Sequence, residues 1–371
     1  MDYKSLLSAM VKQNSSDLHL RVGCAPFFRL YGSLVPAKVP NLTMEDMEKI
    51  LSEMLDEHQL NMLKQRREVD AGIMLSGVGR FRINVYSQRG TPAIAIRNIK
   101  LDVPSFETLN VPETIRNIAM EPRGLILVTG TTGSGKSTLL ASMIDIINTS
   151  RKVNIISIED PIEFLHRNKL ATVAQREVGT DTISYTEALK AAMRQDPDVI
   201  LMGEIRDAET MSLALTAADT GHLVLSTLHT MNTVETVSRA ISFFSYHQHE
   251  QIRHMLASVL TAVVSMRLIP KKGGGLIPAC EIMVNNSNVE DLLKNPDHLN
   301  MINDAIAAGN KIYGSQTFDQ SLEELYKKEL VDFEVAKSFA SNPSDFELKV
   351  LGGISGSSDR TSNVLDSEDD F

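Results

Sequence analysis

A glycine-rich segment carries the strongest chemical signal in the sequence. Its nine residues fit the pattern G-x-x-x-x-G-K-[ST] and are Gly130, Thr131, Thr132, Gly133, Ser134, Gly135, Lys136, Ser137 and Thr138. Glycines let the backbone curl so that its N–H groups point at phosphate oxygens, Lys136 reaches the β- and γ-phosphates, and the Ser137 hydroxyl ligates Mg²⁺. An apolar run precedes the segment and a helical apolar stripe follows it, which favours this function over an incidental turn. We therefore predict that all nine residues bind ATP with Mg²⁺.

Acidic residues follow two other apolar runs. Val153–Ile158 leads into an acidic stretch that contains Glu163, and Val199–Met202 leads into Gly203 and Glu204. The carboxyl ends of parallel strands form one ligand-binding edge, so these acids are expected beside the phosphate loop. Many such sites place an aspartate where this chain has Gly203, so Glu163 is expected to supply further acid chemistry. We predict that Glu163 and Glu204 are catalytic and that Glu204 holds Mg²⁺ with Ser137, although a single turn carboxylate is more often merely solvated.

Two histidines flank the short apolar run Leu223–Leu225. Lone histidines usually pack or cap, and two that are seven residues apart do not face the same way on a simple strand, which argues against a two-histidine metal site. We predict that His229 senses the γ-phosphate and that His222 supports the nucleotide site.

Arginines lie on the polar faces of two expected strands near residue 90. Arg80–Val85 alternates polar and apolar side chains, and Ile94–Ile99 is its expected partner. Arginines stabilise the charge that develops on a transferred phosphoryl group, so Arg82 and Arg97 are candidate catalytic residues that reach the nucleotide of a neighbouring subunit. The equally weighted alternative is a solvated strand face with local ion pairs.

The elements that position these residues divide into two classes. The first hundred residues predict a small α+β domain, including a helix near residues 41–55 with a capping box at Thr43 and Asp46. From Gly124, continuous apolar runs alternate with helical stretches, which indicates an α/β domain with a parallel sheet covered on both faces. Helical periodicity is also expected from Gln248 to Met266 and from Val289 to Leu325.

These patterns give five expected segments. They are an amino-terminal domain over 1–100, a linker over 101–122 with one short helix near Glu113–Met120, an ATPase core over 123–285, carboxy-terminal helices over 286–350, and a disordered acidic tail over 351–371.

Composition excludes several classes of protein. The chain has 371 residues, 43% of them hydrophobic, a net charge of −10 and two cysteines. The cysteine count excludes disulfide scaffolds and four-cysteine zinc sites, and the acidic balance with no Lys/Arg-rich run disfavours a DNA-translocating motor and nucleic-acid binding generally. No apolar run reaches the roughly 20 residues of a membrane-spanning helix, and no secretory signal is recognisable. We expect a soluble cytoplasmic protein without a transmembrane segment.

The motifs, in this order and spacing, resemble those of the secretion ATPase superfamily, and most closely the PilT/PilU group of type IV pilus retraction ATPases. The resemblance extends from Ser16 to about Leu325 and rests on the phosphate loop and on seven further stretches. These are Ser16–Leu20, Arg80-Phe81-Arg82, Ile158–Phe164, Gln175–Val178, Asp196–Glu204, Thr220–Thr230 and Gly314–Gln320.

The resemblance implies a RecA-like ATPase domain behind a PAS-like amino-terminal domain, assembled as a homo-hexamer that hydrolyses ATP for pilus retraction and twitching motility. It implies that Glu163 is the catalytic glutamate, that Glu204 is the Walker B glutamate, and that His222 and His229 form a histidine box. Arginines matching Arg82 and Arg97 act from the first domain. The implied location is the cytoplasm, peripheral to the inner membrane at the pilus base, with an inner-membrane platform protein as partner.

One departure from the group concerns the carboxy-terminal helices. Retraction motors of the PilT branch carry Ala-Ile-Arg-Asn-Leu-Ile, whereas the aligned residues here are Asn288–Leu293, with an acid in place of the arginine. Three alternatives therefore stay open. They are an autonomous retraction motor, a PilU-like accessory or docking subunit that joins or stacks on a paralogous ATPase, and a pilus-assembly or type II secretion ATPase.

Overall fold

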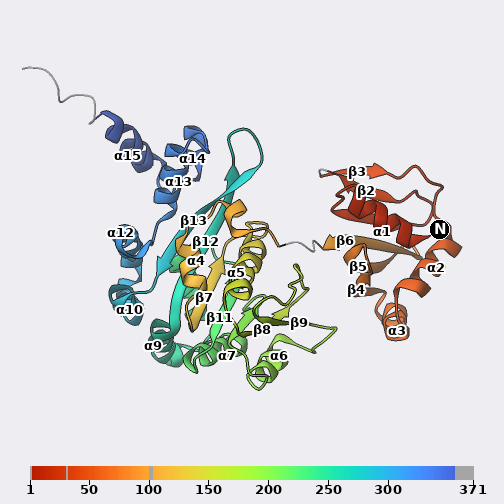
Figure 1. Cartoon of the computed structure of the whole chain (residues 1–371), viewed down its shortest axis with the longest axis horizontal. Helices are drawn as coiled ribbons and strands as arrows, with labels where there is room; N and C mark the ends of the chain where they lie inside the picture. The colour runs from red at the N-terminus through yellow and green to blue at the C-terminus, as the bar shows by residue number, and fades with distance from the viewer. Residues whose placement is uncertain (1, 31, 100–102, 356–371) are drawn as a thin grey trace, which may run out of the picture. The chain divides into compact units, whose positions relative to one another are not determined.

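The computed structural model describes residues 2–30, 32–99 and 103–355 and divides into two compact units (Figure 1). The first unit comprises Met1–Val103 together with Ile162–His166, and the second comprises Pro104–Pro161 together with Arg167–Phe371.

Within the described residues, the first unit contains an antiparallel six-stranded sheet and its helices. In chain order the elements are α1 (Tyr3–Lys12), β1 (Asp17–Arg21), β2 (Phe27–Leu30), β3 (Ser33–Pro36), α2 (Met44–Met54), α3 (Glu57–Arg66), β4 (Glu68–Leu75), β5 (Gly79–Gln88) and β6 (Thr91–Ile99). The strand order is β3-β2-β1-β6-β5-β4.

Local sequence signals in this unit are confirmed by the structure. Helix α2 begins at a capping box, in which the Asp46 N–H donates to Thr43 Oγ1 (3.1 Å) and the Thr43 N–H donates to the Asp46 carboxylate (3.0 Å). Strand β5 alternates as predicted, because Phe81 and its like-facing neighbours are fully buried while the arginines face the other side. The β5–β6 turn uses left-handed angles at Arg89 and Gly90, which suit a two-residue hairpin.

The second unit is an α/β domain. In chain order its elements are η1 (Phe106–Leu109), α4 (Thr114–Ala119), β7 (Gly124–Thr129), α5 (Lys136–Ser150), β8 (Asn154–Glu159), β9 (Thr172–Glu177), α6 (Tyr185–Ala192), β10 (Val199–Met202), α7 (Ala208–Asp219), β11 (Leu223–Leu228), α8 (Thr233–Ser242), η2 (Tyr246–Gln248), α9 (His249–Val259), β12 (Leu260–Pro270), β13 (Leu276–Val284), α10 (Ser287–Lys294), η3 (Pro296–Met301), α11 (Ile302–Ala308), α12 (Asn310–Tyr313), α13 (Phe318–Lys327), α14 (Phe333–Phe339) and α15 (Pro343–Ser355).

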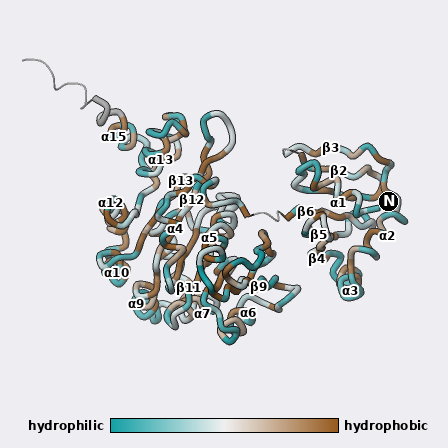
Figure 2. Tube along the Cα trace, viewed as in Figure 1, coloured by the Kyte–Doolittle hydropathy of each residue, from teal (hydrophilic) through white to brown (hydrophobic). Residues whose placement is uncertain are grey.

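The sheet of the second unit is parallel apart from its β12–β13 pair. Across the part of the chain that the structure describes, the strand order is β13-β12-β7-β11-β10-β8-β9. Helices α4 and α5 pack on one face, and α6 to α11 supply the core on the other. Strands β7, β10 and β11 are buried along their whole length. Figure 2 colours the trace by hydropathy and shows hydrophobic stretches within this unit. The predicted α/β class and its four parallel strands are therefore confirmed.

The sequence misassigned one central strand. Helix α9 ends at Val259, and the residues expected to continue it to Met266 form β12, which pairs in parallel with β7. The segment is apolar on every side and includes the β-branched Val263 and Val264, which suits a strand covered on both faces. Periodicity alone does not separate such a run from a buried helix.

The structure gives more detail on two of the expected segments, the linker and the tail. Residues 104–122 contain η1 and α4, and α4 is the short helix predicted near Glu113–Met120. Phe106, Ile115 and Ile118 bury this stretch in the same core as α5. Residues 101–102 of that expected linker lie outside the described residues. Helix α15 includes the first residues of the expected tail, and the remainder, 356–371, lies outside the described residues. In the described ranges, no helix combines the length and apolarity needed to cross a bilayer.

Candidate active site

The phosphate loop joins the carboxyl end of β7 to the amino end of α5. Gly130, Gly133 and Gly135 adopt φ angles of 137°, 81° and 96°, a region that favours glycine. A Cβ atom on Gly130 would lie 2.5 Å from the Met266 carbonyl oxygen and 2.6 Å from Ser134 Oγ. Strand β12 therefore closes the back of the loop so tightly that only glycine fits at its first position.

Donors that point into this loop are ready for an anion. Lys136 is 8% exposed, and its Nζ donates to the carbonyl oxygens of Gly130 (2.8 Å) and Thr131 (3.0 Å). The Ser134 hydroxyl is buried and has no hydrogen-bond partner in the described chain. Helix α5 has no side-chain cap at Gly135, so its first-turn N–H groups also face the loop. These residues fit a nucleotide phosphate chain.

The hydroxyl expected to bind magnesium begins the same helix. Ser137 is the second residue of α5 and is half-buried, while Thr131 and Thr132 are exposed at the loop tip. Magnesium in such sites takes one or two protein oxygens and completes its shell with phosphate and water. Ser137 fits that task because it follows Lys136 directly, and its assignment together with Glu204 remains a prediction.

Glu204 lies at the same edge of the sheet, just beyond β10. Its Oε1 is 3.2 Å from His229 Nε2, and its Oε2 accepts from Arg206 Nε at 2.9 Å. The Glu204 side chain is 19% exposed, whereas the two partners are more open. The structure thus brings together two separately predicted site residues, Glu204 and His229, from loops that follow the neighbouring strands β10 and β11. The ion pair with Glu204 raises the pKa of the Arg206 guanidinium, which therefore stays charged.

A tyrosine that the sequence analysis missed lies beside these acids. Tyr185 begins α6, and an ideal Cβ on Gly203 would be 2.6 Å from its hydroxyl oxygen. Burial, with the charges of Asp160 and Glu159, raises the pKa of the Tyr185 phenol, so it is neutral at physiological pH. No sequence signal distinguishes this residue from an ordinary helix-packing tyrosine.

The acidic stretch after β8 is divided between the two units. Glu159 is the last residue of β8 and accepts hydrogen bonds from Ser157 Oγ (2.8 Å) and Gln175 Nε2 (3.1 Å). Glu163 is exposed and lies in Ile162–His166, the segment that belongs to the first unit. Its role as catalytic glutamate stays a prediction.

His222 lies at the opposite edge of the sheet from the phosphate loop. Leu223 pairs with Gly124 and Leu228 with Thr129, so His222 precedes β11 at the edge where β7 begins. Its Nδ1 lies 2.9 Å from the Ala217 carbonyl oxygen, as expected of a capping histidine. The structure therefore does not bring His222 to the phosphate loop of its own chain.

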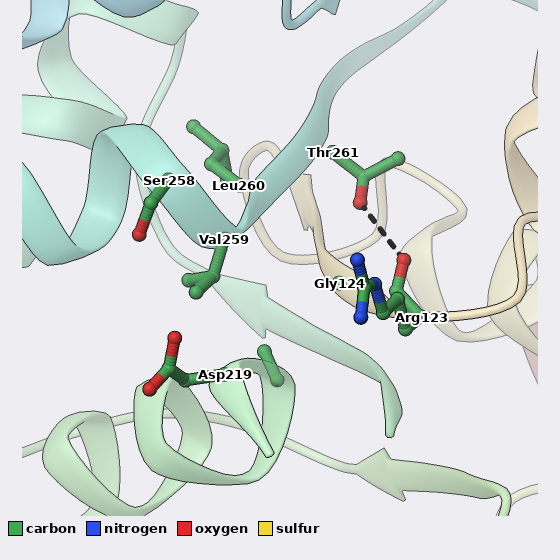
Figure 3. Close-up of a pocket in the computed structure, with 8 residues that line it drawn as sticks. Arg123, Gly124, Asp219, Ser258, Val259, Leu260 and Thr261 are labelled. Atoms are coloured by element: carbon green, nitrogen blue, oxygen red, sulfur yellow. Dashed lines mark hydrogen bonds between the residues drawn. The ribbon is translucent and has the colours of Figure 1, made fainter. Parts of the chain in front are cut away.

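A pocket of about 360 Å³ opens at this opposite edge (Figure 3). It is lined by Arg123, Gly124, Ala218, Asp219, Ser258, Val259, Leu260 and Thr261. The carboxyl ends of α7 and α9 border it, and helix carboxyl ends carry partial negative charge. This pocket consequently suits an anionic phosphate poorly, unlike the loop at the other edge.

The two candidate arginines of the first unit face each other. Arg82 on β5 is directly opposite Arg97 on β6. Asp70 lies 3.7 Å from Arg82, and Asp17 accepts from Arg97 Nε at 3.1 Å. Like charges directly opposite each other destabilise a sheet, and the arginine side chains stay 40% and 69% exposed. The arrangement is suited to binding an external anion, and the catalytic role of both residues stays a prediction.

Fold and site together define a P-loop ATPase of RecA-like topology. Strand β11 lies between β7, which leads into the phosphate loop, and β10, which leads into Glu204. Residues 2–346 match the family described as Type II/IV secretion system protein. The chain belongs to this family.

Individual relatives agree with that assignment. The chain is 40% identical to the type IV pilus retraction ATPase PilT of Pseudomonas aeruginosa over 346 residues, 93% of this chain and 100% of the relative. It is 35% identical to the type IV pilus ATPase PilU of the same organism, over 98% of this chain and 95% of the relative. A crystal structure of the pilus retraction motor PilT with bound ADP is similar with a TM-score of 0.86 and 40% identity, covering 93% of this chain and 98% of that one.

Proposed function

We propose that this chain forms a homo-hexameric ring that hydrolyses ATP to retract type IV pili. The observation that carries the proposal is the edge of the second unit, where the phosphate loop, Glu204 and His229 end three neighbouring strands. The names of the PilT and PilU relatives, which match nearly the whole chain, supply pilus retraction as the work performed. The ring would act at the cytoplasmic face of the inner membrane on a pilus platform protein.

In this mechanism the chain's own residues bind the phosphates, orient the catalytic carboxylate and neutralise the charge on the transferred group. The loop N–H groups and Lys136 bind the phosphates, and Mg²⁺ held by Ser137 and Glu204 would offset charge on the β- and γ-phosphates. His229 and Arg206 hold the two oxygens of Glu204, which fixes the direction of its carboxylate. Glu163 would accept the proton of the attacking water, and Arg82 and Arg97 of a neighbouring subunit would stabilise the transferred group.

The helix α10 supports an accessory role beside a second ATPase. Val289, Leu292 and Leu293 are buried, and the rest of α10 carries two acids and one lysine, with Glu290 paired to Lys294 (2.7 Å) and Asp291 80% exposed. PilT-branch motors carry an arginine in this stretch. A ring whose exposed α10 face has the opposite charge would engage a different surface, which favours a PilU-like subunit that works with a paralogous motor.

Two experiments test these proposals. Lys136→Ala should reduce ATP turnover by at least about a hundredfold, because the phosphates lose their buried cation. Retained turnover would contradict the site. Twitching assays in bacteria lacking one or both retraction ATPases then separate the roles: rescue only when the paralogue is present supports the accessory subunit, rescue without it supports an autonomous motor, and restored pilus assembly would favour the assembly class.

A further inference from the structure

A phenol occupies the space of a side chain that the catalytic edge lacks. Gly203 stands where many P-loop sites carry an aspartate. An ideal Cβ on Gly203 would lie 2.6 Å from Tyr185 Oη, 3.5 Å from Tyr185 Cζ and 3.6 Å from Glu159 Cα. The hydroxyl oxygen of Tyr185 therefore fills the volume into which an aspartate at 203 would project.

The backbone around Gly203 holds this arrangement in place. The Gly203 N–H donates to the Ile158 carbonyl oxygen (2.8 Å), and its own carbonyl oxygen accepts from Thr227 Oγ1 (2.7 Å). Tyr185 is the first residue of α6, whose start is capped by Ser184, and its ring packs against the apolar core of the sheet. Three strand ends and one helix start thus fix the distance between the phenol and the peptide.

The Tyr185 hydroxyl lies near several charged groups but makes no hydrogen bond with them in the described part of the chain. Asp160, Glu159, Glu204 and Arg206 are the charges that act on it, and no hydrogen bond contributes to its environment within the described residues. A neutral phenol both donates and accepts a hydrogen bond. It therefore adds no negative charge to an edge that already holds three carboxylates, which a further aspartate would do.

We propose that the Tyr185 hydroxyl takes over the task of the missing aspartate and orients a water molecule beside the γ-phosphate. Tyr185 is then a positioning residue: it accepts from or donates to water at the edge between β8 and β10 and takes no proton itself. This inference rests on the proposed nucleotide site at the same edge.

Removal of the hydroxyl alone is the direct test. Tyr185→Phe should lower the kcat of ATP hydrolysis about five- to tenfold, the effect of one neutral hydrogen bond, with KM and mant-ADP affinity changed less than twofold. Tyr326→Phe is the matched control, because its ring stacks edge-on against Phe333 among the carboxy-terminal helices. An unchanged kcat in Tyr185→Phe, or an equal loss of mant-ADP affinity, would overturn the inference. Wild-type protein that neither binds nor hydrolyses ATP would overturn the nucleotide site and this inference with it.

Tyrosine fluorescence gives a second readout, since the chain has seven tyrosines and no tryptophan. A non-hydrolysable ATP analogue with Mg²⁺ should change the emission of the wild type and of Tyr326→Phe but not that of Tyr185→Phe. An equal change in all three proteins would show that Tyr185 does not meet the bound nucleotide's water shell.

Gly203→Ala tests the geometry independently of catalysis. The added methyl group should lower Tm in the wild type, where it meets the hydroxyl oxygen, and the loss should be largely relieved in the Tyr185→Phe background, where the nearest ring carbon leaves an ordinary contact of 3.5 Å. Equal losses of Tm in both backgrounds would overturn the placement of the phenol.

Discussion

The two units place their chemistry in different parts of a sheet. In the first unit, β5 and β6 are buried on one side only, and Arg82 and Arg97 project from the polar face. In the second unit, β7, β10 and β11 are buried on both faces, and every polar candidate lies beyond a strand end. An antiparallel sheet with one solvated face offers a surface, whereas a covered parallel sheet offers only its carboxyl edge.

In the proposed function the two units make different contributions. The edge of the second unit provides a narrow glycine loop and an acid, Glu204, held by two partners, which suits binding and cleavage of a triphosphate. The face of the first unit provides exposed cations that local acids only partly neutralise, which suits an anion brought from outside.

The largest effect is expected from the acid at the strand edge. Glu204→Gln keeps the shape of the side chain but removes the charge that His229 and Arg206 hold, so kcat should fall by about a thousandfold while mant-ADP still binds. Steady-state hydrolysis and fluorescence titration measure the two quantities. Glu209→Gln, at an exposed α7 carboxylate paired with Lys190, should leave both near wild type. A small kcat change in Glu204→Gln would contradict the catalytic role of Glu204 at this edge of the sheet.

The arginine face should follow in size. Replacing Arg82 and Arg97 together by alanine should lower turnover of the assembled protein by about a hundredfold, because the stabilising cations are lost. Thermal unfolding should stay close to wild type, since the exposed ion pairs with Asp70 and Asp17 contribute little and the opposed charges are relieved. Arg21→Ala, at an exposed residue of β1, is the control. Unchanged turnover in the double variant would contradict a catalytic role for Arg82 and Arg97 and would support the alternative of a solvated strand face with local ion pairs.

The two histidines sharpen the contrast within a single sheet. His229→Ala should lower kcat about tenfold, because Glu204 loses one of its two partners, whereas His222→Ala should change mant-ADP affinity less than twofold. The same binding and turnover assays apply to both. A larger loss of nucleotide affinity in His222→Ala would mean that the opposite edge takes part in the site.

The smallest expected effect is on the pH dependence of stability and concerns Glu281, a buried acid on β13. Burial raises the pKa of the Glu281 carboxyl, even though the Thr233 N–H at the start of α8 donates to it (2.7 Å). The folded state therefore holds this proton more tightly than the unfolded chain does. The contribution of the protonated Glu281 to folding stability is complete below the pKa of the unfolded state, and it is lost as pH rises through the higher pKa of the folded state. Denaturant midpoints measured upward from pH 4 should fall less steeply in Glu281→Gln than in the wild type. Parallel curves would contradict the shift.

Several elements followed directly from local sequence. The capping box of Thr43 and Asp46, the alternation of β5 and the loop from Gly130 to Thr138 are each set by neighbours within a few residues. The strand β12 did not follow, because an apolar segment covered on both faces has no solvent-facing side to give it a period.

The sequence by itself determined the reaction class, because the glycine loop, its lysine and its hydroxyl are consecutive residues, and their spacing alone identifies a phosphate-binding loop. Only the tertiary structure decided which distant residues join that loop. It placed His229 on Glu204, moved His222 to the far edge, opposed Arg82 to Arg97, and set Tyr185 over Gly203. Those contacts depend on strand order, register and helix packing, which are properties of the whole sheet and leave no mark in the spacing of the residues themselves.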